Sequence, residues 1–174
     1  MIAADACMEI GLEVPPLDDV LIRGLDKILP SYWSKGNPVD MVASMSMEAY
    51  LSCLEILISW EKVDAVISLS GDAGPLSGIL SDVKKKAEGF VPAENLKRIS
   101  DEILAGRKKI YQRIYELIEI YKKPILAVGS NLVRGEKEAR PDFSLPQFRT
   151  PERAAEAAGR LYQYSRYRKA VGAF

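Results

Sequence analysis

Apolar residues recur at three- and four-residue spacing in several long segments of the chain, and this periodicity is typical of helices with one buried face. Gly11 and Pro30 end the first two segments, because glycine accepts a left-handed backbone and proline cannot continue a helix. Ser46, with Glu48 in the turn after it, and Thr150, followed by proline and glutamate, are typical helix N-caps. The pattern therefore predicts helices over Met1–Ile10, Leu17–Leu29, Ser46–Trp60, Glu94–Lys122 and the segment after Thr150.

Short apolar segments alternate with these helices. Val63–Leu69 and Pro124–Val128 are typical of strands buried on both faces of a parallel sheet. Leu145–Phe148 is expected to be a short edge strand limited by its proline. The alternation predicts one α/β domain over residues 1–174, with a flavodoxin-like, doubly wound, mainly parallel sheet and helices on both faces.

Two further segments are polar. The lysine-rich segment Leu80–Gly89 predicts a short helix or an irregular cap, and Asn131–Phe143 predicts an exposed loop. On the final helix, tyrosines alternate with arginines at Arg160, Tyr162, Tyr164, Arg166, Tyr167 and Arg168. We expect these side chains to pack in the core and on the surface rather than to bind RNA, because the chain as a whole is neutral.

The balance of positive and negative charge argues against nucleic acid and anionic membranes as partners. Lys and Arg number 24 and Asp and Glu number 24, so no net field would attract nucleic acid or an anionic membrane. No apolar stretch is long enough to cross a bilayer, and we expect neither nucleic acid nor membrane as a partner. Cys7 and Cys53 lie in apolar helical patterns without metal-ligand spacing, which favours reduced thiols and a cytoplasmic protein.

Histidine is absent from the sequence, and this excludes several kinds of active site within the chain. A Ser-His-Asp or Cys-His site and an imidazole metal site cannot form. Asp18 and Asp19 form an obvious acidic pair, but neighbouring helix residues point about 100° apart. We interpret them as a solvated helix start and predict no catalytic and no metal-binding residue.

Two loops are candidates for binding. Gly71, Gly74 and Gly78 follow a predicted parallel strand, where backbone N–H groups can approach an anion, although plain turns have the same composition. Asn37, Pro38 and Asp40 form a polar corner, which is either a structural turn or a docking loop.

Five segments in order resemble one protein family. They are AADACMEIGLEVPPL, GNPVD at Gly36–Asp40, VDAVISL, KPILAVG and FRTPERAAEAAGRLYQYSRYR. Together they resemble the second flavodoxin-like domain of the NDP-forming acyl-CoA synthetases, in the succinyl-CoA synthetase superfamily. The family pattern also has a strand and a Gly-Gly loop before the first segment. Neither occurs in this sequence, so we expect the first strand of the sheet to be missing. The stretch Gly74–Ile110 is longer than the family's connection, and FSLPQF stands in place of its last strand.

The resemblance implies a part in a larger enzyme that converts acyl-CoA, phosphate and ADP to acid, CoA and ATP. It implies a histidine-bearing, CoA-binding partner and an ATP-grasp domain or subunit, with CoA, ATP or ADP and Mg required by the whole enzyme and no cofactor bound by this domain alone. Met1, Ile2, Ala3 and Ala4 would be the helix end that faces a phosphohistidine of another domain. The isolated chain would be inactive. The alternative is a stand-alone or regulatory module that binds a small anion or a protein.

Overall fold

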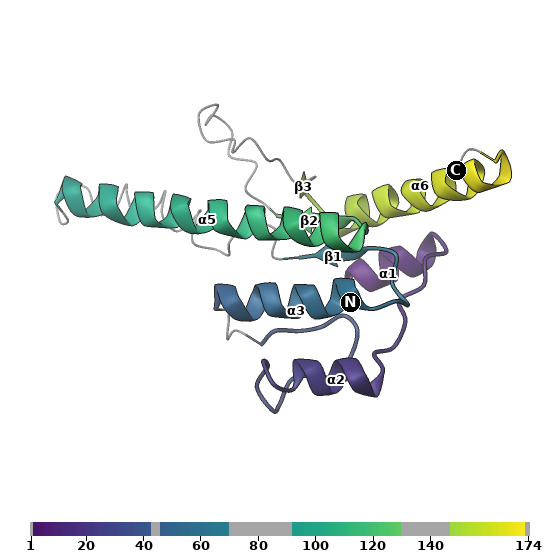
Figure 1. The fold of residues 1–174 in the computed structure, drawn as a ribbon, viewed down its shortest axis with the longest axis horizontal. Helices are drawn as coiled ribbons and strands as arrows, with labels where there is room; N and C mark the ends of the chain where they lie inside the picture. Colours follow the sequence, from purple (N-terminus) through teal and green to yellow (C-terminus); the bar gives the residue numbers. More distant parts are fainter. Residues whose placement is uncertain (1, 43–45, 70–91, 130–146, 173–174) are drawn as a thin grey trace.

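The computed structural model of the protein describes residues 2–42, 46–69, 92–129 and 147–172 (Figure 1). The predicted segments Leu80–Gly89 and Asn131–Phe143 lie outside the described residues. In chain order the elements are α1 (Ile2–Glu9), α2 (Asp19–Leu25), α3 (Met47–Ser59), β1 (Val66–Ser68), α5 (Ala93–Tyr121), β2 (Ile125–Val128), β3 (Gln147–Phe148) and α6 (Pro151–Ala170).

The described strands form one small parallel sheet in the order β1-β2-β3. All of β2 is buried, as predicted, because it is the central strand and helices pack on both of its faces. The expected edge strand is confirmed as β3. The prediction for Val63–Leu69 was wrong in its extent and burial. Only Val66–Ser68 is strand, and Val66 and Ile67 are half-buried because, among the described strands, β1 pairs with β2 alone.

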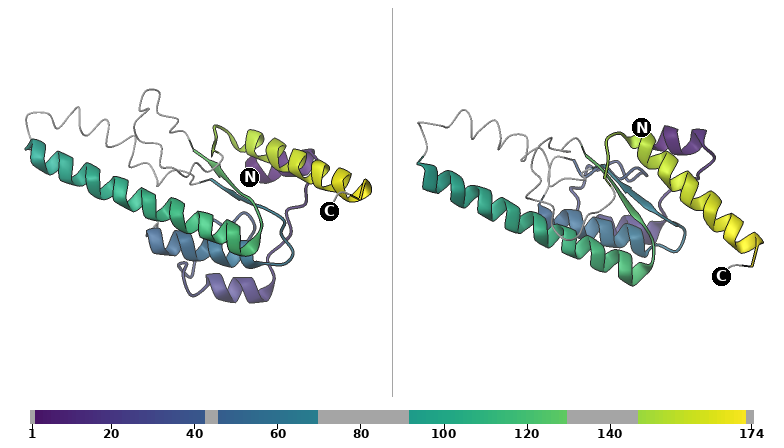
Figure 2. Two further views of the ribbon diagram at one scale, coloured as in Figure 1. Left: turned by 45° about the horizontal axis from the view of Figure 1, so that its top comes forward. Right: turned by 90° about the horizontal axis from the view of Figure 1, so that it is seen from above.

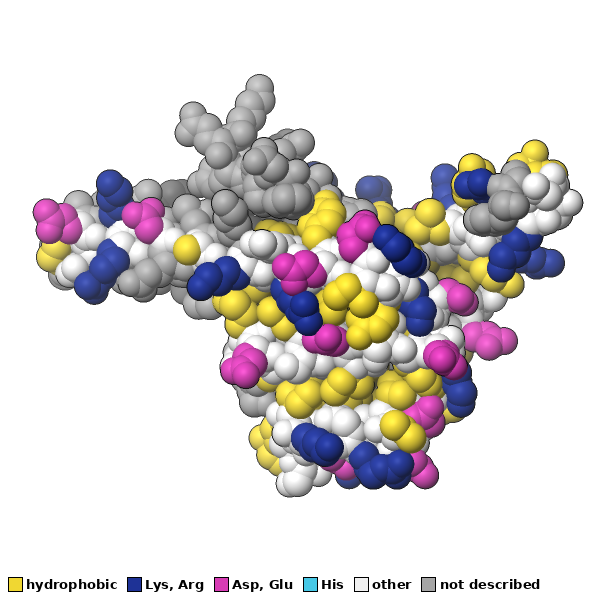
Figure 3. Space-filling model, viewed as in Figure 1, with side chains coloured by type: hydrophobic (Ala, Val, Ile, Leu, Met, Phe, Trp, Pro, Cys, Tyr) yellow, Lys and Arg dark blue, Asp and Glu magenta, His cyan; other side chains and the backbone are white. Residues whose placement is uncertain are grey.

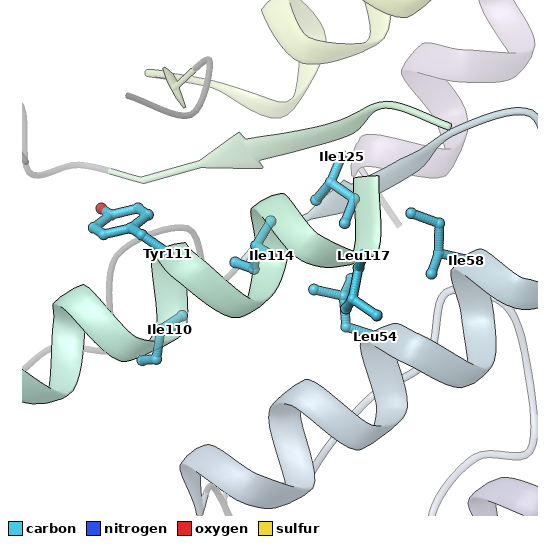
Figure 4. Packing of buried hydrophobic residues seen from close by; sticks show 7 residues of the cluster. All are labelled: Leu54, Ile58, Ile110, Tyr111, Ile114, Leu117 and Ile125. Carbon is cyan, nitrogen blue, oxygen red and sulfur yellow. The ribbon is translucent and has the colours of Figure 1, made fainter. Parts of the chain in front are cut away.

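Side chains of β2 point alternately to two helical layers. Ile125 contacts Leu117 of α5 and Ile58 of α3, within the cluster drawn in Figure 4. Leu126 and Val128 pack on the other side against Ala154 and Ala158 of α6. Helices therefore lie against both faces of the sheet (Figure 2), and this α/β arrangement is compatible with a flavodoxin-like fold.

Several helix ends follow the sequence signals. Ser46 accepts a hydrogen bond from the Ala49 N–H at 3.0 Å and caps α3, as predicted. At the other end of α3, Lys123 Nζ donates to the carbonyl oxygens of Ile58 and Trp60 at 3.2 and 2.7 Å. These bonds satisfy carbonyls that the helix leaves unpaired, and they hold the start of β2 beside α3.

The second helix is shorter than the predicted Leu17–Leu29. Asp18 caps it through the Leu21 N–H, and the regular helix ends at Leu25. The chain then turns, so that Leu29 and Trp33 pack with Leu25 and Cys53 of α3 in one buried cluster. The apolar residues whose spacing predicted a longer helix are therefore buried against α3 by a turn instead.

The last helix projects beyond the rest of the molecule (Figure 1). Its first half packs through Ala154, Ala155, Ala158 and Gly159. The expectation that Tyr162, Tyr164 and Tyr167 pack was wrong, because all three are exposed. They are exposed because α1 is short: the segment that packs on α6 ends at Ile10, which lies beside Gly159.

Candidate functional site

Three helices have their N-terminal ends at the carboxyl edge of the sheet. The start of α6 follows β3 directly, and α3 lies with Tyr50 beside Ser68, the last residue of β1. Contacts of Ala6 with Ala155 and of Ile10 with Gly159 make α1 parallel to α6. The N-terminal end of α1 therefore points the same way. Such ends carry partial positive charge and free N–H groups, which favour an anion.

The predicted phosphate-facing end is α1, of which Met1 lies outside the described residues. Ile2 is 63% exposed, Ala4 is half-buried, and Ala3 is buried with 8% exposure. These side chains are small or apolar and add no charge of their own to this end of the helix. Asp5, in the first turn, is the one charged side chain on this end of the helix.

Polar side chains lie beneath the carboxyl edge in one row of the sheet. Ser68, Ala127 and Gln147 are aligned across the three strands, so their side chains share a face. Ser68 and the Tyr50 hydroxyl are 2.8 Å apart, and Gln147 Nε2 donates to the Tyr111 hydroxyl at 2.8 Å. Burial raises the pKa of Tyr50, against the opposing hydrogen bond to Ser68. These groups are neutral and already bonded, so they tie helices to strands.

Of the predicted loops, the structure describes the one around Asn37. The side-chain amide of Asn37 donates to the Pro15 carbonyl oxygen at 3.0 Å, and the Asn37-Pro38 peptide bond is cis. Asp40 accepts from the Val42 N–H at 2.9 Å and closes a turn. These bonds are internal and favour the structural-turn interpretation. No described contact joins this loop to the α1 end. Gly71, Gly74 and Gly78 lie outside the described residues.

The reactive groups of the chain offer little nucleophilic chemistry. The sequence holds no histidine, and both cysteines are buried. Burial raises the pKa of the Cys53 thiol to about 11 and also raises that of Cys7, so both are protonated near neutral pH. Across the described ranges, no group of three or more Cys, Asp or Glu side chains is placed to hold a metal ion. No helix in those ranges is long and apolar enough to cross a membrane.

Comparison with known proteins shows that this chain is similar to parts of ADP-forming CoA ligases. No family model matches. The curated relatives include the 4-hydroxybutyrate–CoA ligase of Nitrosopumilus maritimus, 22% identical over 95% of this chain and 20% of its own length. Subunit alpha of acetate–CoA ligase II of Pyrococcus furiosus is 25% identical over 95% of this chain and 31% of its own length. Acetate–CoA ligase I of Archaeoglobus fulgidus is 35% identical over 69 residues, 40% of this chain and 10% of its own length.

These relatives support the resemblance to the NDP-forming acyl-CoA synthetases. The chain spans less than a third of the length of each of the three.

Sequence reasoning predicted a helix near the start of the chain and a polar corner at Asn37, and the structure has a helix and a turn there. It missed the Tyr50–Ser68 and Tyr111–Gln147 pairs. The partners lie 18 and 36 residues apart, and no local pattern marks such pairs. The position of Ser68 next to the last residue of the predicted strand Val63–Leu69 was the one available signal.

Proposed function

We propose that this chain is a domain of an NDP-forming acyl-CoA ligase that lacks the catalytic histidine. In this role the N-terminal end of α1 stabilises a phosphohistidine carried by another domain. The fold would be the doubly wound, flavodoxin-like domain of that family, with a further strand beside the outer edge of β1. CoA, ATP or ADP and Mg would bind to the CoA-binding and ATP-grasp parts.

The observation that carries the proposal is the extent of the similarity. Two ADP-forming ligases match 95% of this chain, and the matched part is 20% and 31% of their own lengths. A chain without histidine cannot form a phosphohistidine itself. A supporting domain within a larger ligase accounts for both facts.

The α1 end is suited to a phosphoryl group that comes from outside. Its first-turn N–H groups have no partner within the helix, and Ala3 and Ala4 present no side chain that would cap them. A doubly negative phosphoryl group placed there gains from the helix dipole by about 0.3–1 kcal/mol, and more where the site is partly buried.

The substitution Ala4→Glu tests this role by separating stability from activity. An acid in the first turn of α1 favours the helix, so the melting temperature should stay equal or rise slightly. The same charge repels a phosphoryl group. When the chain is combined with the CoA-binding, histidine-bearing and ATP-grasp parts of an ADP-forming ligase, acyl-CoA synthesis should therefore fall about tenfold.

The matched control is Gln163→Glu, which makes the same change of charge on the exposed part of α6. Its rate should equal that of the unchanged chain. If Ala4→Glu leaves the rate of the reconstituted ligase unchanged, or if both variants lower that rate equally, the role assigned to α1 is wrong. Activity that never depends on this chain would sink the proposed function as a whole.

The binding-module alternative makes a different prediction for the isolated chain. Calorimetric titration with CoA, nucleotides and inorganic phosphate should show no tight binding if the chain only supports a phosphohistidine held elsewhere. Tight binding of one of these ligands by the chain alone would favour the alternative.

A further inference from the structure

The C-terminal part of α6, residues 160–170, forms a projecting segment that we call the tail. None of its residues is buried, whereas Ala154, Ala155, Ala158 and Gly159 just before it are. Large apolar side chains stand open along the tail and just after it: Leu161 at 50%, Tyr164 at 59% and Val171 at 54% exposure. A helical segment of this length without packing is marginal in water, so a docked surface would stabilise it.

The tail is also strongly basic. From Ala157 to the end of the chain there is no acidic residue, and the cations are Arg160, Arg166, Arg168 and Lys169. Arg166 lies over the ring of Tyr162 at 5.9 Å. Basic and apolar side chains alternate on the projecting end in Figure 3. This surface fits a partner that is both apolar and acidic.

The outward face of α1 has that chemistry. Asp5, Met8 and Glu9 share one face at three- and four-residue spacing, opposite the buried Ala6 and Cys7. Met8 is 58% exposed, and the described residues give neither acid an ion pair. Glu9 also stands in the last turn of α1, which holds no basic residue, although the negative end of a helix favours a cation.

The two surfaces cannot meet within one chain. Because α1 and α6 run parallel, with Ile10 beside Gly159, the tail continues past the end of α1 and away from it (Figures 1 and 2). A second copy turned by a two-fold axis brings its tail back along α1, and the reverse contact then forms at the same time.

We propose that this chain forms a two-fold dimer in which the tail of each copy docks on the Asp5–Met8–Glu9 face of α1 in the other. The contact is made by the outward face of α1 and by the tail, and it does not depend on the proposed function.

Paired charge reversals test the dimer. One variant carries Arg160→Glu and Arg168→Glu, which share a face of the tail with Tyr164 at four-residue spacing, and the other carries Asp5→Lys and Glu9→Lys in α1. Sedimentation velocity on the unchanged chain, up to millimolar concentration, should show a monomer–dimer equilibrium. Each variant alone should dissociate about tenfold more easily or worse, because like charges then face each other. An equimolar mixture of the two should regain dimer, since every facing pair is again opposite in sign.

Two further measurements keep the test decisive. Circular dichroism checks that both variants retain their helices, and Tyr164→Ala should weaken the dimer without touching α1 or any charge. Gln112→Glu, at an exposed position of α5 outside both surfaces, is the matched single-charge control and should leave the affinity unchanged. A chain that stays monomeric throughout, a dimer indifferent to the reversals, or a mixture that fails to reassociate would each overturn the proposal. So would a monomer whose tail instead binds nucleic acid or anionic vesicles.

Discussion

Both tryptophans bury their rings and give their single N–H to an aspartate. Trp60 Nε1 donates to Asp18 at 2.9 Å, and Trp33 Nε1 donates to Asp26 at 2.8 Å. Asp18 also caps α2 through the Leu21 N–H, and this bond, followed by the Trp60 bond and the nearby charge of Lys62, lowers the pKa of Asp18. Trp33 and then Lys35 lower the pKa of Asp26. Each carboxylate thus joins two segments that the chain must bring together.

These lowered pKa values predict a loss of stability in acid. A carboxylate with a lower pKa in the folded chain stabilises it above the ordinary value of 3.8, and the contribution disappears as pH falls through the folded-state pKa. Asp26→Asn should therefore lower the free energy of unfolding at neutral pH, and its difference from the unchanged chain should shrink towards pH 3 or so. Urea unfolding over that pH range measures this difference.

The control for this experiment is Asp64→Asn, at an exposed position without a described ion pair. It should leave the acid dependence as it was. A deficit of Asp26→Asn that keeps the same size from neutral pH into acid would show that lost packing, rather than the charge, is responsible.

At the level of residues, local chemistry was predictable and distant partners were not. Ser46 and Thr150 were predicted as helix caps from their neighbours, and both accept the expected N–H. Asp18 was expected at a helix start, which is correct, but its bond to Trp60 joins residues 42 positions apart. A side chain's immediate neighbours determine the cap, whereas the tertiary fold determines the second partner.

The packing of α1 on α6 depends on small residues. A Cβ atom added at Gly159 would lie 3.0 Å from Ile10 Cδ1, while Ala6 and Cys7 meet Ala155 one turn earlier. The two helices can therefore approach closely, and large side chains at these positions would push α1 off the molecule.

Gly159→Ala and Gly159→Leu should change stability in opposite directions. The neighbouring atom is the end of a flexible, half-exposed side chain that can turn aside, so alanine should gain about 0.5 kcal/mol from its better helix propensity. Leucine cannot be accommodated and should cost about 1–3 kcal/mol. Chemical denaturation of both variants measures the two effects.

Combining Gly159→Leu with Ile10→Ala should recover part of the loss, because the alanine makes room. Additive losses would mean that Ile10 is not the residue that limits this position.

Among the elements, strands were recognised from composition but their burial depended on neighbours. The apolar segment of β2 was expected to be buried on both faces, and it is, because α3 and α5 cover one face and α6 covers the other. A similar composition predicted the same for Val63–Leu69, but Val66 and Ile67 of β1 are half-buried, and Leu69, just after the strand, is exposed. Apolar composition indicates a strand, but it does not indicate how many strands pair with it.

In the molecule as a whole, two layers of unequal strength cover the sheet. The layer of α3 and α5 buries large side chains, among them Leu54, Ile58, Ile114 and Leu117, and Arg113 adds an ion pair to Glu55 at 2.9 Å. The layer of α1 and α6 buries mainly alanines. A buried methyl group contributes about 0.8 kcal/mol, and a buried leucine or isoleucine about 1.5–3 kcal/mol. The second layer should therefore open before the first.

Hydrogen exchange in dilute protein, where any dimer is dissociated, should resolve this order. Amides of Ala6 and Cys7 in α1 should exchange through an opening that costs several kcal/mol less than global unfolding, because α1 is short and held by small side chains. Amides of Leu54 and Ile58 in α3 should exchange only with global unfolding. Low concentrations of denaturant should leave the α1 opening almost unchanged and accelerate the α3 amides steeply. One common opening free energy for both helices would show instead that the two layers unfold as a single unit.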